Sequence, residues 1–433
     1  MAATEKAQRL SELVGQAATR LDRWFDSNGW AGWDPFDIRE NPVYLRCTSG
    51  RLGKAPAFVV RKAEIYAPVA LRRTLGVRRR IYPKGMGLLT ASYADLFTAT
   101  GHEGYLAKAK RCAEWLENNT SAGFTGACWG YPFDWHARIL IPRGTPSSVV
   151  SAVVGDGFWR LYRVTGDERY LKVCQDIAKF FLAHLRRSFE SDDAICFSYT
   201  PIDDFQVHNA NLFVAEFLAR VGKETADEAL VDTALKAGRF ALMEQNDDGS
   251  LYYWGKAQEA KYSPNGKGWI DHFHSGFEIR LLHGLWQNTG DSPFRLGYQA
   301  YYDFYRAKLY LEGGVPKFTP DLQYPVDVHS CAEAILCNAT VLQEQAEALA
   351  LLQKVLGWTI ENMEYRPGQY AYWLVQKRSK IIRVSIPFIR WGQSWMLRAL
   401  SHALLQLTPT AQRTQIMATA NQPNSARASE ERV

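Results

Sequence analysis

Three segments of the chain share a Thr-Gly turn followed by an amphipathic helix, and this repeat constrains the fold more than any other feature. The turns lie in 98-TATGHEGYLAKAKRCAEWL-116, 163-RVTGDERYLKVCQDIAKFF-181 and 287-QNTGDSPFRLGYQAYYDFY-305, and 219-ARVGKETADEALVDTALKAGRFAL-242 is a looser copy. Glycine suits the left-handed residue that ends a helix, and the polar residue after it favours the start of the next helix. Each copy is therefore predicted to join two antiparallel helices.

The helix before each turn is apolar over most of its circumference, which is typical of a helix buried on both sides. The helix after each turn carries charge on one face and is predicted to lie on the outside. A short aromatic, strand-like segment follows each outer helix. The predicted inner helices are 86–99, 147–164, 208–221, 274–288, 329–343 and 391–406, and the aromatic segments are 128–135, 196–203, 250–255, 314–320 and 369–375.

Six inner helices that alternate with outer ones, with residues 6–25 counted as an outer helix, predict an all-α fold, an (α/α)6 barrel. This toroid is expected to form one domain over residues 1–407, and the polar segment 408–433 is expected to be a disordered tail. A double ring has two mouths. The tight turns are expected to leave little room at one mouth, so the pocket is predicted at the other, where the aromatic loops meet the N-termini of the inner helices.

Charge and composition narrow the class of protein. The formal net charge is +6, and it is spread thinly apart from clusters such as 77-VRRR-80 and 377-KRSKIIR-383, so we expect no nucleic-acid partner. No run of 18 apolar residues predicts an integral membrane segment, and the N-terminus lacks the apolar region of a signal peptide. The seven cysteines contain no C-x-x-C, which argues against a disulfide framework or structural zinc. A cytoplasmic protein is expected.

Three histidines, His208, His274 and His329, each begin an inner helix at the predicted wide mouth. They are candidates for a ring of imidazoles around a sugar, one of which could act as general acid or base near neutral pH. The alternative is a structural role, in which each histidine caps its helix or is hydrogen-bonded in the core. A fourth histidine, His272, is expected on the preceding loop as a substrate-binding residue.

Carboxylates follow two of these histidines by one helical turn. Glu278 and Glu333 lie four residues after a histidine, on the same helix face, and Asp156 lies within an apolar inner helix. They are candidate catalytic residues, as an acid–base pair or as groups that orient the histidines, although each could instead be a buried carboxylate with a structural partner. The two His-x-x-x-Glu units could also supply four metal ligands, but no metal is predicted.

Aromatic and polar side chains of the loops and of the last inner helix are candidates for sugar binding. Aromatic rings stack on the apolar faces of pyranose rings, amides hydrogen-bond hydroxyls, and an arginine can bind a sugar carboxylate in bidentate fashion. Each of these residues could instead fill the core or fix a loop. The candidate substrate-binding residues are Trp129, Tyr131, Asp134, Trp135, Arg143, Asn211, Tyr253, Trp391 and Gln393.

With its hairpins counted, the chain resembles the six-hairpin glycosidase-like superfamily over nearly its whole length. The turn 161-LYRVTGDERYL-171 looks like the repeat turns of unsaturated glucuronyl hydrolases, and 390-RWGQSWMLRAL-400 is similar to the R-x-x-Q-A-W segment that lines their barrels. The segments 33-WDPFDI-38 and 129-WGYPFDW-135 look like toroid proteins encoded among bacterial polysaccharide genes. The resemblance implies an (α/α)6 fold and a carbohydrate or glycan substrate.

The resemblance does not select a reaction. The catalytic aspartates of the glucuronyl hydrolases, the Asn-His-Ser cluster of the alginate lyases and the late His-Glu segment of the 2-epimerases are not found in their usual contexts. The leading hypothesis is an enzyme that uses histidine and carboxylate acid–base chemistry on a sugar that could carry a uronate, by epimerisation or elimination. The alternatives are glycoside hydrolysis by two carboxylates and non-catalytic glycan binding in polysaccharide assembly. No cofactor is predicted, because no Walker loop, dinucleotide fingerprint or nucleophile elbow is present.

Overall fold

Six helices form a closed inner ring in the computed structural model, which describes residues 2–49, 54–263 and 268–420. Each inner helix contacts the next along the chain, and the last, α16, contacts the first, α5. These helices are apolar on nearly all sides because they pack against two neighbours in the ring and one outer helix. They are α5 (Pro83–Thr100), α7 (Ser148–Thr165), α9 (His208–Thr225), α12 (His272–Thr289), α14 (Val328–Thr340) and α16 (Trp395–Leu407).

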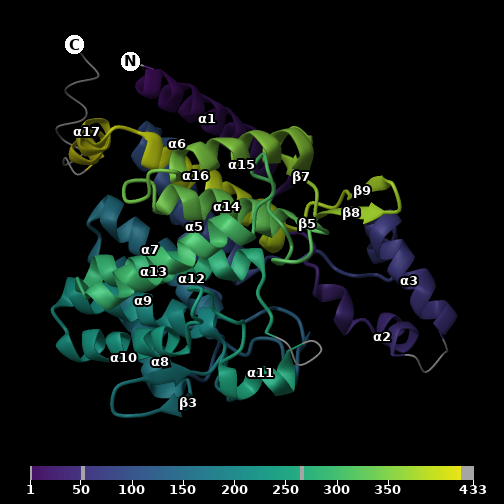
Figure 1. Cartoon of the computed structure of the whole chain (residues 1–433), viewed down its shortest axis with the longest axis horizontal. Coiled ribbons are helices and arrows are strands. Elements are labelled where there is room, and N and C mark those ends of the chain that lie inside the picture. Colours follow the sequence, from purple (N-terminus) through teal and green to yellow (C-terminus); the bar gives the residue numbers. More distant parts are fainter. Residues whose placement is uncertain (1, 50–53, 264–267, 421–433) are drawn as a thin grey trace.

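Six outer helices surround this ring, and each packs against one inner helix (Figure 1). They are α1 (Ala2–Asn28), α6 (Glu103–Glu117), α8 (Glu168–His184), α10 (Glu228–Glu244), α13 (Ser292–Lys308) and α15 (Ala348–Met363). The N-terminal helix α1 packs against α16, so the first helix of the chain completes the last hairpin. The predicted (α/α)6 barrel is confirmed.

The predicted Thr-Gly turns join the inner helices to the outer ones. Gly101, Gly166 and Gly290 end α5, α7 and α12 with positive φ angles of 72°, 66° and 73°. The looser copy differs from the prediction, because α9 continues through Gly222 and ends at Ala226, whose φ is 53°. A Cβ on Gly222 would lie 2.9 Å from the Leu230 side chain, so this glycine permits close packing of α9 on α10.

Three of the aromatic segments, 128–135, 196–203 and 369–375, contribute to short antiparallel ladders at the mouth where the inner helices begin, whereas 314–320 makes only the bridge from Pro316 to Tyr310. Only β5, β8 and β9 form a sheet of three strands among the described residues, in the order β5-β8-β9. Residues 250–255 form no strand, and Trp254 makes a single bridge to Val207. The strands are β1 (Trp135–His136), β2 (Leu140–Ile141), β3 (Arg187–Glu190), β4 (Ile195–Phe197), β5 (Val326–Asp327), β6 (Glu364–Arg366), β7 (Gln369–Tyr370), β8 (Trp373–Lys377) and β9 (Lys380–Val384).

Several elements are additional to the six hairpins. Three short helices, α2 (Pro42–Thr48), α3 (Lys54–Tyr66) and α4 (Pro68–Thr74), lie between the first outer helix and the first inner helix. In Figure 1, α2, α3 and the β8–β9 hairpin project together from one side of the toroid. The remaining additions are a 3₁₀ turn (Asp37–Glu40), α11 (Lys256–Tyr262) and a π-helical turn (Ile389–Ser394) that leads into α16.

The C-terminal segment differs from the prediction of a disordered tail. Helix α17 (Thr410–Ala420) contacts α5 and α7, and Ile416 approaches Gly101 at the end of α5. Ile416 and Met417 supply the apolar contact that holds this helix, a signal too short to stand out in a polar segment. Residues 421–433 of the expected tail lie outside the described residues. All seven cysteines are free thiols. None of the described helices is both long and apolar enough to span a membrane.

Candidate active site at the wide mouth of the toroid

The start of α12 holds a histidine in a fixed orientation at the mouth where the inner helices begin. Asp271 is the N-cap of α12 and accepts a hydrogen bond from the backbone N–H of His274. The other oxygen of Asp271 lies 2.6 Å from Nδ1 of His274 and also accepts from Trp269 Nε1. Because an ionised carboxylate accepts the Nδ1 proton, Nε2 of His274 keeps its lone pair free to act as a base.

The charge state of Asp271 supports this arrangement. Burial disfavours the ionised carboxylate, but the electrostatic and hydrogen-bond interactions with His274 and the hydrogen bond from Trp269 outweigh burial and hold the pKa of Asp271 below its usual range. The side chain of His274 is 21% exposed, whereas that of Asp271 is 4% exposed. The pair therefore combines a shielded carboxylate with an imidazole that is partly open to solvent.

His329 begins α14 and lies within a cage of aromatic rings. Its ring centroid is 4.5 Å from that of Trp391, 4.7 Å from that of Phe273 and 4.9 Å from that of Trp395. Neither ring nitrogen has a hydrogen-bond partner among the described residues. Burial, followed by the charges of Lys84 and Arg390, lowers the pKa of His329 well below its usual value, so the imidazole is neutral. Two unpaired buried nitrogens leave room for a polar partner, either a water molecule or a ligand group.

Two basic side chains lie beside the aromatic rings of this site, and neither was among the predicted site residues. Arg390, in the π-helical turn, makes two hydrogen bonds of 2.6 and 2.9 Å to Asp34 and lies over the ring of Tyr131. Lys84, at the start of α5, lies 5.4 Å from the ring centroid of Trp395, and burial followed by repulsion from Arg390 lowers its pKa well below the usual value. A lysine at the second position of an otherwise apolar inner helix was the available sequence signal.

An aromatic cavity of about 320 Å³ opens at this mouth. Two predicted sugar-binding residues, Trp135 and Tyr253, line it, and the ring centroid of Tyr253 lies 4.5 Å from that of His274. The cavity also carries cationic side chains that were not predicted. The remaining lining residues are Phe36, Arg39, His136, Ala137, Arg138, Ile141, Tyr199, Phe205, Val207 and Trp254.

Three other predicted binding residues are buried in structural contacts. Trp129 is fully buried and donates its indole N–H to the Leu116 carbonyl. Asn211 bridges the backbone of Phe197 and Ala237, and Gln393 donates to the Tyr370 carbonyl. The two amides satisfy loop and helix backbone groups and are fully buried, so they are not presented to a sugar hydroxyl.

The other predicted binding residues lie around the site. Tyr131 stacks on Phe133 beneath the cation of Arg390, and Trp391 donates its indole N–H to Asp327, the N-cap of α14. Asp134 and Arg143 pair with each other at the surface, and Arg143 also reaches Glu40. The Asp134–Arg143 ion pair holds the loop that carries Trp135.

Two of the predicted histidines face outer helices and do not complete a ring. His208 stacks on Phe240 of α10, and His272 lies against Tyr305 and Tyr310. His272 is the first residue of α12 and is fully buried, which differs from the loop position expected for it. Burial lowers the pKa of both imidazoles to about 3. The site therefore brings His274 and His329 together and leaves His208 and His272 in the core.

The two predicted glutamates also separate. Glu278 accepts a hydrogen bond of 2.7 Å from Tyr301 on α13, and burial raises its pKa well above the usual value. Glu333 makes two hydrogen bonds to Arg280, and burial raises its pKa although the Arg280 charge opposes this. The residues described contain no group of three or more His, Cys, Asp or Glu side chains placed to hold a metal ion.

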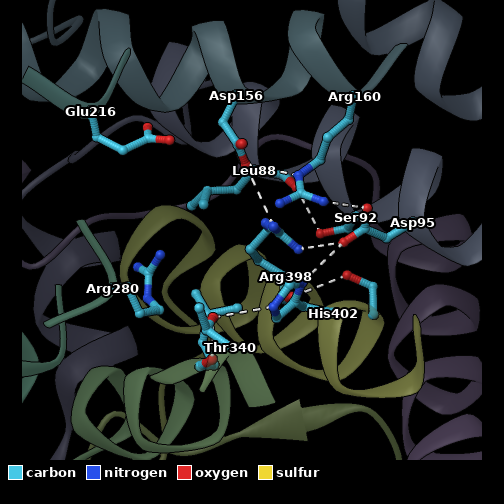
Figure 2. Close-up of polar contacts among 12 residues, drawn as sticks. Leu88, Ser92, Asp95, Asp156, Arg160, Glu216, Arg280, Thr340, Arg398 and His402 are labelled. Atoms are coloured by element: carbon cyan, nitrogen blue, oxygen red, sulfur yellow. Dashed lines mark hydrogen bonds and ion pairs between the residues drawn. The ribbon is translucent and has the colours of Figure 1, made fainter. Parts of the chain in front are cut away.

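A second cavity, of about 470 Å³, lies at the mouth where the tight turns were expected to leave little room. The tight turns pass outside the ring, so the ends of the inner helices leave its centre open. Charged side chains of the inner helices surround the cavity and point toward one another (Figure 2). Asp156 pairs there with Arg160, Arg220 and Arg398. Asp95 pairs with Arg160 and Arg398 at 2.7 Å each.

These ion pairs connect four neighbouring inner helices. Arg398 joins α16 to α5 and α7, Arg160 joins α7 to α5, and Arg220 joins α9 to α7. Burial opposes ionisation of Asp156, but the arginine charges outweigh it and hold its pKa well below the usual range. An ionised carboxylate with three arginine partners is suited to holding the ring closed and is a poor proton donor.

Comparison with known proteins gives structural matches. The chain aligns with an unsaturated glucuronyl hydrolase specific for heparin at a TM-score of 0.57 and 15% identity, covering 91% of this chain and 96% of that one. An α-mannanase of Bacteroides thetaiotaomicron aligns at 0.58 and 14%, covering 84% and 97%. Cellobiose 2-epimerase from Bacillus thermoamylovorans aligns at 0.54 and 12%, covering 74% and 87%.

The chain has the fold of these toroid proteins. The resemblance to the six-hairpin glycosidase-like superfamily is thus confirmed at the level of the fold. No protein-family model matches the sequence, and no curated protein matches it. At 11–15% identity the toroid fold does not specify which residues act or on what substrate.

Asp271 is the functional candidate that the sequence prediction missed within its own central motif. In the segment 271-DHFHSGFE-278, Asp271 lies three residues before His274. At this spacing an N-cap carboxylate can contact both the backbone N–H and the side chain of the third residue after it. Asp327 has the same position before α14 and accepts from Trp373 and Trp391. The toroid thus repeats one N-cap aspartate at two inner helices, with a histidine following each.

Proposed function

We propose that this toroid is a carbohydrate-active enzyme that binds a uronate-containing sugar at the wide mouth and removes a carbon-bound proton with His274. The single observation that carries the proposal is the Asp271–His274 pair, whose free Nε2 belongs to a partly exposed imidazole next to an aromatic cavity. Similarity of fold to a hydrolase, an epimerase and a lyase that act on sugars supports the substrate class.

The aromatic cavity supports sugar binding. Trp135, Tyr253 and Trp254 present apolar ring faces of the kind that stack on pyranose rings, and a volume of about 320 Å³ suits one or two sugar units. Arg39 and Arg138 line the same cavity and supply donors for a carboxylate. An acidic sugar therefore satisfies both the aromatic and the cationic parts of the wall.

The proposed chemistry uses general base catalysis. The proton on the carbon next to a uronate carboxyl group is acidified by that group, and Nε2 of His274 accepts it while the electron pair moves into the carboxyl group. Asp271 stabilises the imidazolium that forms. Return of a proton to the opposite face gives epimerisation. Departure of the oxygen substituent on the neighbouring carbon, which takes up the proton held by His274 while the electron pair forms a carbon–carbon double bond, gives elimination.

Hydrolysis by two carboxylates has less support from the geometry. It requires one ionised and one protonated carboxyl group on either side of the glycosidic bond. Asp156 lines the opposite cavity, while Glu278 and Glu333 are fully buried and bonded to Tyr301 and Arg280. Non-catalytic glycan binding would use the same aromatic cavity but gives no role to the oriented base. The free thiols are compatible with the expected cytoplasmic location.

Incubation of the full chain with uronate-containing oligosaccharides in D2O tests this function. We expect deuterium at the carbon next to the carboxyl group, or an unsaturated uronate that absorbs in the ultraviolet, and no exchange with neutral oligosaccharides. Release of reducing ends without deuterium or unsaturation would instead establish hydrolysis. Saturable binding with neither change would establish a binding protein.

A further inference from the structure

A basic unit outside the six hairpins has its own small core. Val384, Ile386 and Phe388 are buried there, and Ile65 of α3 and Val69 of α4 pack against them together with the aromatic residues of β8. Arg72 of α4 lies over the Phe388 ring at 4.6 Å. Helices α3 and α4 and the β8–β9 hairpin therefore form one body, called here the basic unit (residues 54–74 and 373–388). It projects from one side of the toroid in Figure 1.

The basic unit and the adjacent helix α2 expose more large apolar side chains than the rest of the surface. Of the twelve such side chains among the described residues, five lie here, although these segments form a small part of the chain. Phe58, Val59 and Tyr66 of α3 are 58%, 63% and 57% exposed. Lys62 lies over the rings of both Phe58 and Tyr66, so Phe58, Lys62 and Tyr66 share one face of α3. The other two are Val43 on α2 and Ile381 on β9.

The same unit concentrates positive charge. Residues 54–74 and 377–383 contain nine Lys or Arg and one acid, a net charge of +8 against +6 for the whole chain. The single acid, Glu64, accepts a hydrogen bond from Tyr44. Seven of the cations are exposed and form no ion pair with an acidic side chain among the described residues: Lys54, Arg61, Arg73, Lys377, Arg378, Lys380 and Arg383. The fold thus brings the basic cluster 377–383 together with the cations of residues 54–74.

We propose that the basic unit docks the protein on an anionic lipid surface. An interfacial helix that carries aromatic and aliphatic side chains among lysines and arginines inserts the apolar groups between head groups while the cations attract anionic lipids. The exposed Val59 and Ile381 gain free energy from such insertion, whereas binding to nucleic acid would use the cations and leave these two side chains in water. Docking of a second copy through the same surface would place two basic units, each with a net charge of +8, against one another, and their repulsion opposes such a dimer.

The docking surface adjoins the wide mouth of the toroid. Trp391, which packs on His329 in the candidate site, also packs against the core of the basic unit. Phe36 and Arg39 line the aromatic cavity, and the 3₁₀ turn that contains Arg39 lies just before α2 in the chain. A protein held by α3 would therefore present this cavity close to the lipid surface. The docking proposal rests on the exposed side chains alone and does not depend on the proposed reaction.

Co-sedimentation of the full chain with vesicles tests the docking. We expect at least about tenfold more protein bound to mixed phosphatidylglycerol–phosphatidylcholine vesicles than to pure phosphatidylcholine, with the difference reduced by high salt. The double variant Phe58→Ser/Val59→Ser and the double variant Arg61→Ser/Lys380→Ser should each reduce binding several-fold. Leu296→Ser, which removes a 67% exposed leucine from α13, is the matched control and should bind as the wild type does.

Three outcomes would overturn the proposal. The first is equal binding to the two kinds of vesicle. The second is binding that is lost in the charge variant but kept in Phe58→Ser/Val59→Ser, which would indicate a general polyanion surface. The third is a wild-type dimer that Phe58→Ser/Val59→Ser converts to a monomer with no change in vesicle binding. Turnover of soluble oligosaccharides should be unchanged in all these variants, so a failure of docking is distinguishable from a failure of the proposed reaction.

Discussion

Asp271 holds His274 through two contacts at once, one to the backbone N–H and one of 2.6 Å to Nδ1 of the ring. A single N-cap residue therefore fixes both the start of α12 and the direction of the imidazole. We expect His274→Asn to lower kcat by about 10²-fold to 10⁴-fold, because it removes the general base. Asp271→Asn should also lower kcat, since an amide cannot select the Nδ1–H tautomer or stabilise the imidazolium.

Steady-state kinetics with the oligosaccharide identified in the D2O experiment give kcat for each variant and check this prediction. His102→Asn is the control, because His102 is an exposed N-cap histidine at the opposite mouth. Wild-type kcat in His274→Asn would remove the oriented base from the account.

His329 is expected to lower stability while it serves binding. Its two nitrogens are buried without partners, and an unpaired buried polar group costs about 1–3 kcal/mol. His329→Phe keeps the aromatic contacts and removes the unpaired nitrogens, so we expect the free energy of unfolding to stay equal or rise by about 1 kcal/mol while KM for the sugar rises. Urea denaturation and kinetics measure the two quantities. A marked loss of stability would show that His329 has a structural partner.

A variant of Asp156 distinguishes the proposed acid–base mechanism from hydrolysis by two carboxylates. Asp156→Asn leaves Arg160, Arg220 and Arg398 around a neutral group, and loss of one partner of a buried charge cluster costs about 3 kcal/mol or more. We expect lower stability with kcat close to that of the wild type, measured below the melting transition. Loss of kcat without loss of stability would favour a catalytic Asp156 and hence hydrolysis.

The buried histidines predict how stability depends on pH. Burial lowers the folded-state pKa of His208 to about 3, so below the unfolded-state value of about 6.5 the unfolded chain takes up a proton that the folded chain does not. Its contribution to stability is therefore lost as pH falls from about 6.5 toward 3. Asp37 and Asp327, whose pKa values burial raises to about 6, act in the opposite direction.

A comparison of variants isolates the histidine effect. Between about pH 7 and pH 5, we expect His208→Phe to lose about 2 kcal/mol less stability than the wild type loses, with His102→Asn matching the wild type. Urea denaturation at the two pH values gives both differences. Identical pH dependence in the wild type and His208→Phe would mean that His208 is protonated in the folded protein.

The fold was predictable because the hairpin repeat is a local signal. The αL residue at Gly101, Gly166 and Gly290 and the apolar helices before each of them need only sequence spacing to be recognised. Ala226 was not predicted, because an alanine gives no sign of positive φ. The open narrow mouth was also missed, since the direction of the turns relative to the ring depends on how twelve helices pack together.

The site was predictable in part. His274, Trp135 and Tyr253 come together because helix N-termini and inter-hairpin loops share one mouth, which follows from topology. Whether a histidine faces the axis, as His329 does, or an outer helix, as His208 does, depends on the helix rotation, and a shift of one residue turns a side chain by about 100°. The gathering of charge on the basic unit likewise required long-range packing of α3 on β9.

The most direct test of the central claim compares sugar binding at the two mouths. Trp135 lines the aromatic cavity, and Trp159 lines the charged cavity at the opposite end. If the sugar stacks at the wide mouth, loss of about 60 Å² of apolar contact in Trp135→Ala should raise the Kd for a uronate oligosaccharide about tenfold, measured by isothermal titration calorimetry. Trp159→Ala should leave the Kd within about twofold. A raised Kd in Trp159→Ala with an unchanged Kd in Trp135→Ala would place the sugar at the narrow mouth and contradict the account.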